Sequence, residues 1–112
     1  MLSRENIVEV SDLKVTPVDV PEWGGVVGVR ALTGAERDTL EKLMRSRGED
    51  TAETRAIVVA LSCCNDAGEP IFSLNDIATL QKKNAVALDR IFKVSASINL
   101  LSPQKVEAEA KN

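Results

Sequence analysis

Few side chains in this sequence are suited to acid–base or metal chemistry. The chain contains no histidine, which removes the commonest general base and metal ligand and the usual serine and cysteine triads. Its two cysteines, Cys63 and Cys64, are adjacent, without the two-residue spacer that lets paired thiolates hold zinc. Neighbouring cysteines also rarely form a strain-free disulfide. We expect reduced thiols that pack as small apolar residues at the end of a helix, and no bound metal.

The carboxylates and glycines form no recognisable catalytic motif. Four carboxylates stand at predicted helix starts: Glu36, Asp38, Glu53 and Asp76. Helix dipoles and solvation explain them, whereas acid–base catalysis would need a pair in a cleft with separated pKa values. The glycine cluster in residues 24–28 fits neither Gly-x-Gly-x-x-Gly nor a Gly-Lys-Ser/Thr loop, so it indicates a turn. We therefore expect neither an enzyme nor a cofactor-binding protein.

Trp23 is the residue that most needs an explanation, because it is the only tryptophan and stands in a turn where small polar residues would suffice. Two interpretations stay open. The indole covers the core of the hairpin, or it is an exposed anchor for a partner, since Trp is enriched at binding hot spots. We take six residues as candidate partner contacts, each of which could instead belong to the core: Trp23, Val26, Val27, Leu40, Leu43 and Met44.

Composition narrows the classes of partner. The chain has 112 residues, 44% of them hydrophobic and 28% charged, which suits one globular domain. The composition argues against nucleic acid as a partner. The net charge is −3 and the basic residues are interleaved with acidic ones, which gives no basic face for phosphates. Only 3% of the residues are aromatic and there is no Tyr, which gives no surface for stacking bases. No apolar run approaches the roughly 18 residues that span a bilayer, and residues 1–6 do not resemble a secretion signal. We expect a cytoplasmic protein without a membrane or nucleic-acid partner.

The elements that position these residues begin with a β-hairpin. Ser3 can cap a short helix in the first dozen residues. Valines then alternate with other residues in 18–20 and 27–29, which predicts two strands with one buried face. The Pro-Glu-Trp-Gly-Gly segment between them can turn the chain tightly. The hairpin should extend from Lys14 to Ala31, with Pro17 at an edge or a bulge.

Helices are predicted after the hairpin from their capping residues. Thr33 and Glu36 form a capping box for a helix that reaches about Ser46, with Gly48 as its carboxyl-terminal cap. Asp50 or Thr51 can cap a second helix to about Ser62. Residues 65–70 read as a surface turn, and an extended 61–64 would make a second small hairpin with 71–72. The fold class is thus α+β, a hairpin packed on a bundle of about four helices.

Two further helices complete that bundle. Ser73 and Asp76 open a short helix to about residue 82, and Asn84 caps a helix from 85 to about 100. The apolar and small residues that line one face of this last helix are Leu88, Ile91, Phe92, Ser95 and Ile98. We expect a single domain over residues 1–102. Residues 103–112 form a polar tail too short for a stable isolated helix.

Residues 18–38 read Val18-Asp19-Val20-Pro21-Glu22-Trp23-Gly24-Gly25-Val26-Val27-Gly28-Val29-Arg30-Ala31-Leu32-Thr33-Gly34-Ala35-Glu36-Arg37-Asp38. This segment resembles the small tail assembly chaperones of phages and prophages with long, non-contractile tails. The resemblance extends from about residue 2 to 102. Ala60-Leu61-Ser62, Ile71-Phe72-Ser73, Leu88-Asp89-Arg90-Ile91-Phe92 and Asn99-Leu100-Leu101-Ser102 also carry it. The Pro-Glu-Trp-Gly-Gly hairpin followed by Leu-Thr-Gly-x-Glu-Arg is its most specific part.

The resemblance implies a non-enzymatic factor, the short form of such a chaperone. Members of that family self-associate and bind the tape measure protein, keeping it soluble in the host cytoplasm until tail tube subunits assemble around it, and they are absent from the virion. A longer form, made by ribosomal frameshifting, recruits the tail tube protein. The ending Ala110-Lys111-Asn112 is compatible with a slippery A-rich run in the gene, and a gene lacking such a run would exclude frameshifting there.

Two rival functions follow from the same sequence. A small structural tail protein or head–tail connector would be found in purified particles, whereas a chaperone would not. A small-molecule or peptide-binding regulator would have a well-formed pocket and a ligand-dependent melting temperature.

Overall fold

The computed structural model describes residues 1–47 and 51–101, and its hairpin matches the predicted one. Strand β1 (Val15–Val20) pairs antiparallel with β2 (Gly25–Arg30). Val18 and Val20 are buried in the core, Thr16, Pro17 and Asp19 are exposed, and Val15 is half-buried. The predicted cap at Gly48, the alternative cap at Asp50 and the predicted tail 103–112 lie outside the described residues.

Strand β1 is an edge strand, as the proline at position 17 predicts, because β2 lies between β1 and a third strand, β3 (Cys63–Cys64). The N–H of Ala31 donates to the C=O of Lys14 across the ladder. Backbone groups alternate in direction along an antiparallel pair, so Val15, Pro17 and Asp19 direct theirs away from β2. Pro17 has no N–H to present there, which is why the strand tolerates it.

The turn between β1 and β2 is a 3₁₀ helix, η1 (Pro21–Trp23). Pro21 occupies its first turn, where a missing N–H costs nothing. Gly24 ends the helix in the left-handed region, with φ of 78°, and its N–H donates to the C=O of Pro21. Gly25 has no such requirement and begins β2, so the turn uses the conformational freedom of only one glycine.

The cysteines correct one prediction. Helix α3 (Thr51–Ser62) ends before them, and Cys63 and Cys64 form a two-residue strand, β3, paired with β2 at Val29 and Gly28. Both are buried free thiols, as expected, but they extend the sheet rather than the helix. The open alternative of a second hairpin is correct only in part, because Cys64 bridges Pro70 while Ser62 remains helical.

Local capping signals place the other helices where the sequence predicts them. Helix α2 (Gly34–Arg47) has the predicted capping box, in which Thr33 and Glu36 exchange side-chain-to-backbone hydrogen bonds of 2.9 and 3.1 Å. Ser73 opens a 3₁₀ turn, η2 (Leu74–Asp76), that leads into α4 (Ile77–Leu80). Asn84 caps α5 (Ala85–Ile98) through the N–H of Ala87.

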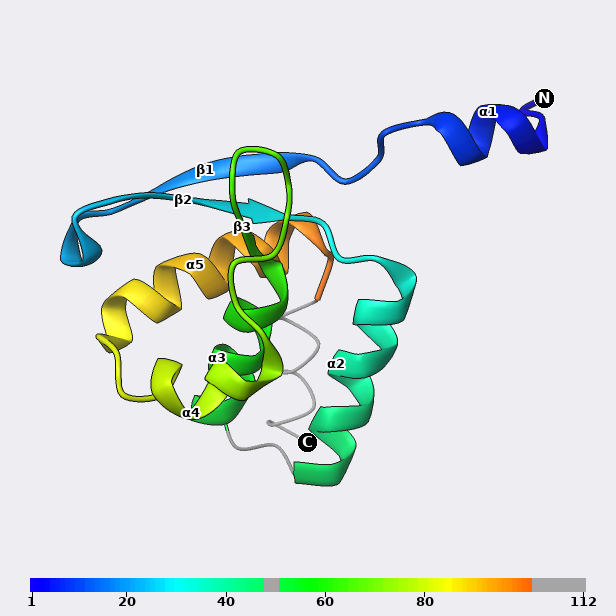
Figure 1. Cartoon of the computed structure of the whole chain (residues 1–112). Coiled ribbons are helices and arrows are strands. Elements are labelled where there is room, and N and C mark those ends of the chain that lie inside the picture. Colours follow the sequence, from blue (N-terminus) through cyan, green and yellow to red (C-terminus); the bar gives the residue numbers. More distant parts are fainter. Residues whose placement is uncertain (48–50, 102–112) are drawn as a thin grey trace.

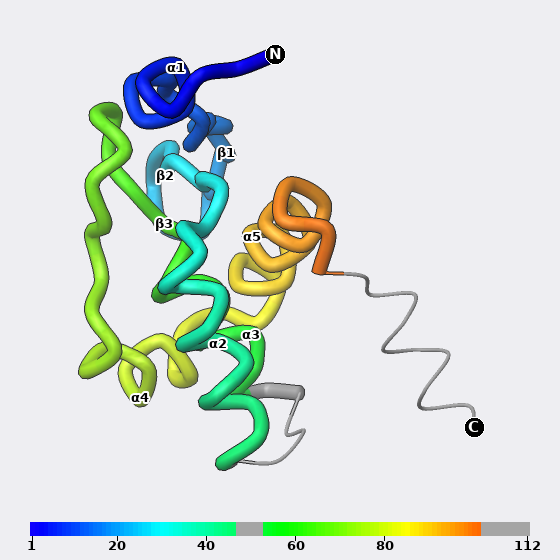
Figure 2. The backbone as a smooth tube through the Cα atoms, turned by 90° about the vertical axis from the view of Figure 1, so that its right-hand side faces the viewer, coloured from blue at the N-terminus to red at the C-terminus, as the bar shows by residue number. Residues whose placement is uncertain are grey.

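The core lies between the sheet and the helices (Figure 1). Residues 56–60 of α3 are all buried, and α5 contributes its predicted stripe, in which Ile91 and Ser95 are fully buried. Figure 2 shows α5 on one side of the sheet and the segment 65–71 on the other. The fold is therefore the predicted hairpin packed on helices, enlarged by β3. None of the described helices is long and apolar enough to span a bilayer.

Helix α1 (Arg4–Glu9) stands apart from this core (Figure 1). Ser3 caps it, as predicted, and exchanges hydrogen bonds with Asn6. None of its residues is buried, and residues 10–14 connect it to β1 without regular structure. We call residues 1–14 the arm.

Candidate functional site

The tryptophan of the hairpin turn forms one wall of an open groove of about 390 Å³, which we call the Trp23 groove. Trp23 and Phe72 are half-buried, pack against the core and supply the exposed apolar surface of the groove, and the buried Leu80 also lines it. The groove thus lies where η1 meets α4 and the segment before it. Its polar and charged lining residues are Glu22, Asp76, Thr79 and Lys83.

An ion pair fixes the hairpin turn on α5 beside this groove. Arg90 donates two hydrogen bonds to the carboxylate of Glu22, of 2.6 and 3.0 Å. These hydrogen bonds lower the pKa of Glu22 to about 2, so the carboxylate stays charged at neutral pH. Bidentate pairs constrain geometry as well as charge, and this one holds the turn that carries Trp23.

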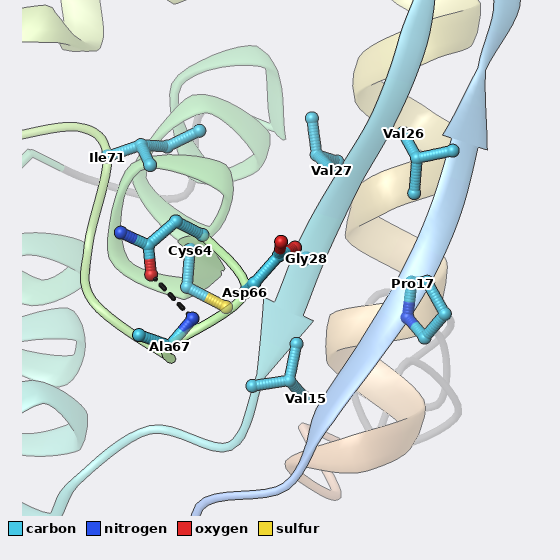
Figure 3. A pocket seen from close by; sticks show the side chains of 10 residues that line it. Val15, Pro17, Val26, Val27, Gly28, Cys64, Asp66, Ala67 and Ile71 are labelled. Atoms are coloured by element: carbon cyan, nitrogen blue, oxygen red, sulfur yellow. Dashed lines mark hydrogen bonds between the residues drawn. The ribbon is translucent and has the colours of Figure 1, made fainter.

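A second open groove, of about 530 Å³, lies on the sheet face opposite α5 (Figure 3). We call it the hairpin groove. Its walls are β1, β2 and the segment 65–71, which is held by a turn in which Asn65 Oδ1 accepts from the N–H groups of Ala67 and Glu69. The lining residues are Val15, Pro17, Val26, Val27, Gly28, Cys64, Asn65, Asp66, Ala67 and Ile71. Asp66 is the only charged one.

Gly28 makes the floor of the hairpin groove possible. A Cβ on Gly28 would lie 2.9 Å from three atoms: the carbonyl oxygen and Sγ of Cys64, and Cγ1 of Val15. Such distances are shorter than van der Waals contact, so only glycine lets β3 approach β2 closely here.

Two sets of side-chain hydrogen bonds connect β2, α2 and α5: the ion pair of Arg30 with Glu36, and the side-chain amide of Asn99. Arg30 is 3% exposed, and its guanidinium donates to both carboxylate oxygens of Glu36, at 2.9 and 2.8 Å. Burial raises the pKa of Glu36, but hydrogen bonds from Arg30 and Thr33 outweigh it and the net shift is downward. Nε of Arg30 is buried without a hydrogen-bond partner.

Asn99 completes this connection from the end of α5. Its Oδ1 accepts from the N–H of Leu32 at 2.7 Å, and its Nδ2 donates to the C=O of Ser95 at 3.0 Å. Arg37 of α2 donates to the C=O of Asn99 at 2.9 Å. Hydrogen bonds therefore join the sheet to α2 and α5.

The thiols near the hairpin groove are poor nucleophiles. Burial, with a smaller contribution from Cys64, raises the pKa of Cys63 to about 12, and burial also raises the pKa of Cys64. A neutral thiol neither attacks nor binds metal well. Within residues 1–47 and 51–101, no group of three or more Cys, Asp or Glu side chains is placed to hold a metal ion.

The six candidate contact residues occupy different places. Trp23 lines its groove, while Val26, 64% exposed, and Val27 line the hairpin groove. Leu40 is 2% exposed and belongs to the core. Leu43 and Met44 are half-buried on α2 and pack against the core, away from both grooves. The six therefore form no single surface: Val26 and Val27, neighbours in sequence, share the hairpin groove, Trp23 lines the other groove, and three lie on α2 in or against the core.

Sequence reasoning missed the partners that turn these residues into grooves. Phe72 lines the same groove as Trp23, and Ile71 lines the same groove as Val26 and Val27. Ile71 is 46% exposed although it is a large aliphatic residue. The signal available in the sequence was the pair Ile71-Phe72 isolated between two polar turns, which has no helical or strand periodicity of its own.

Comparison with known proteins bears on the fold. No protein-family model matches the chain, and no curated protein matches its sequence. The solved structure of the tail assembly chaperone of bacteriophage HK97 is similar to this one, with a TM-score of 0.61 and 15% sequence identity. The match covers 84% of this chain and 94% of that chain. The chain therefore has the same fold as that chaperone.

Proposed function

We propose that this chain is a phage tail assembly chaperone that binds the tape measure protein through the Trp23 groove. The observation that carries the proposal is the match to the HK97 tail assembly chaperone, which extends over 94% of that chain. The groove supplies a physical means. The half-buried Trp23 and Phe72 present apolar surface, and charged residues stand beside them, which suits one face of an amphipathic helix.

Holding such a client requires no bond to be made or broken. A long helical protein with exposed apolar stripes aggregates unless other surfaces cover those stripes. Many copies bound along one client gain from high effective concentration even if each contact is weak. Weak contacts also let tail tube subunits displace the copies. The proposal accordingly includes self-association, action in the host cytoplasm, absence from the finished virion, and a frameshifted longer form that recruits the tail tube protein.

The test uses the full chain and the tape measure protein encoded by the same phage. Co-expression should raise the soluble yield of the tape measure protein. Trp23→Ala should remove most of this effect, weakening binding by about tenfold or more if Trp23 is a hot-spot residue. Leu100→Asn is the matched control, because Leu100 is exposed, lies outside both grooves and has φ of 51°, which Asn tolerates.

A second measurement does not depend on a substitution. Trp23 is the only tryptophan, so its emission reports on this groove alone. Titration with a tryptophan-free helical peptide of the tape measure protein should shift that emission to shorter wavelength as the indole is covered. An unchanged emission at saturating peptide would place the client elsewhere. The chain's presence in purified particles would instead favour a structural tail or connector protein.

A further inference from the structure

We propose that the arm of one copy binds in the hairpin groove of a second copy, and that this contact is how the chain self-associates. The inference rests on the self-association included in the proposed function and assigns it to named residues. It begins from the arm, whose large apolar residues are all exposed, including Ile7 at 57% and Val8 at 65%.

Helix α1 is too short to be stable without a partner. It has six residues, whereas isolated helices below about 12 residues are marginal in water. Its capping box satisfies N–H groups at its start, but no side chain of α1 is buried. A second surface that covers its apolar side would supply the missing stabilisation.

Helix α1 is amphipathic, with aliphatic side chains on one side and acidic side chains elsewhere. Arg4, Ile7 and Val8 have i, i+3, i+4 spacing and share one side of the helix, while Glu5 and Glu9 lie off that side. The carboxylate of Glu5 is 3.8 Å from the guanidinium of Arg4 in an exposed pair, which contributes little and leaves Arg4 able to change partner. The docking side therefore presents two aliphatic side chains and one cation, and an arginine stem can itself pack on apolar surface.

The hairpin groove complements that pattern. Its apolar lining includes Val15, Pro17 and Val26 on the sheet and Ile71 on the facing segment, and its single charged lining residue is the acidic Asp66 (Figure 3). The cation of Arg4 thus has one carboxylate to meet while Ile7 and Val8 enter the apolar part. Opposite charges across a contact fix its register as well as its partner.

The position of the arm's base explains why the occupant is another copy. The arm leaves the domain at Lys14, next to Val15, which is itself a wall of the groove, and α1 points away from its own sheet (Figure 1). A two-fold axis near this point would place each arm in the other copy's groove, because such interfaces are reciprocal. Residues 10–14 span about 16 Å when extended and α1 adds about 9 Å, which is enough to cross from one domain to the next.

The test measures association of the full chain and its variants by sedimentation velocity over a range of concentrations. Ile7→Asp in the arm and Ile71→Asp in the groove should each raise the dissociation constant by about tenfold or more. Val86→Asp is the matched control: Val86 is 61% exposed and belongs to neither surface, so association should be unchanged. Circular dichroism melts check that each variant is folded.

Mixing the two variants separates this arrangement from other modes of association. The Ile7→Asp chain retains a working groove and the Ile71→Asp chain retains a working arm, so a mixed pair keeps one unaltered arm-in-groove contact, whereas neither variant keeps one with itself. An equimolar mixture should therefore associate more tightly than either variant alone. Arg4→Glu and Asp66→Lys should likewise each weaken association, and the chain carrying both should recover it.

The outcomes distinguish this inference from the proposed function. If the wild-type chain associates but the arm and groove variants associate equally well, the arm-in-groove contact is wrong and the proposed function is untouched. Failure of the mixture to associate would overturn the pairing of arm with groove. A wild-type chain that is monomeric at every concentration, yet still solubilises the tape measure protein, would overturn self-association alone.

Discussion

Glycine at position 28 is a packing requirement of the sheet. Its missing side chain lets Cys64 lie against β2, and an added Cβ would meet three atoms at 2.9 Å, two of them on Cys64. We expect Gly28→Ala to lower the free energy of unfolding by about 1–3 kcal/mol, the usual cost of overpacking. The measurement is urea denaturation at neutral pH.

The matched control for this substitution is Gly25→Ala. Gly25 lies in the same strand, has nothing within 4 Å of a built Cβ and has no positive φ. Its substitution should change stability by less than about 0.5 kcal/mol or stabilise slightly, because alanine loses less backbone freedom than glycine. Equal losses from the two substitutions would show that strand propensity, rather than contact with Cys64, sets the cost.

Glu36 has two roles, as helix cap and as counter-ion of Arg30. Glu36→Gln should cost about 1–3 kcal/mol at neutral pH, because it leaves the buried guanidinium of Arg30 without a balancing charge. Glu41→Gln is the control, since Glu41 pairs with Arg37 at 3.8 Å on the surface, where such pairs contribute little.

The cost of Glu36→Gln should depend on pH in a defined direction. The pKa of Glu36 is lower in the folded chain than its ordinary value of 4.5, so the folded state binds its proton less tightly than the unfolded state does. Its stabilising contribution is full above about pH 4.5 and is lost as the pH falls through the lower folded pKa. Denaturation curves for wild type and variant should converge in acid. A constant difference at all pH values would contradict this account.

At the scale of elements, Asn99 is the connection between α5 and the segment joining β2 to α2. Asn99→Ala removes the acceptor of the Leu32 N–H and the two N–H groups of Nδ2, which donate to Ser95 and toward the C=O of Arg30. We expect a loss of about 2 kcal/mol and faster amide exchange at Leu32. The exposed Asn75 is the control, and Asn75→Ala should leave both unchanged. Unchanged exchange at Leu32 in the Asn99 variant would contradict the assignment.

Elements whose signals are local in sequence were predictable. The caps at Ser3, Thr33, Ser73 and Asn84 each depend on residues within three positions, and the hairpin depends on alternation across one short turn. Strand β3 was not predictable in this way. Cys63 and Cys64 follow a helix directly, and only their pairing with β2, far back in the chain, makes them a strand.

The site was less accessible to sequence reasoning than the fold. Trp23 was identified as unusual from its type and position, but Phe72 and Leu80, which share its groove, become neighbours only when α4 packs beside the turn. Arg30 alternates with Val29 and would be expected in solvent. Its side chain is buried where it pairs with the carboxylate of Glu36, six residues later. Packing between elements distant in sequence decides the first case, and the pairing of β2 with the start of α2 decides the second.

At the scale of the whole molecule, the two grooves lie on separate surfaces. The Trp23 groove lies between the hairpin turn and α4, and the hairpin groove lies on the outer face of the sheet. A chain that used both in the proposed way could bind a client and a neighbouring copy at once. Copies would then line up along the client, which is the arrangement in which weak individual contacts add to firm overall binding.

A proline protects each edge of the sheet against pairing with strands from other molecules. Pro17 places a nitrogen without hydrogen in the middle of the outward row of β1, and at the other border the chain's own Pro70 bridges Cys64. Unprotected borders invite the strand-to-strand stacking of amyloid fibres. In the proposed function, copies crowded along one long client would be exposed to that hazard. The two prolines would then leave reversible contacts between side chains, such as the proposed arm-in-groove contact, for the association of copies.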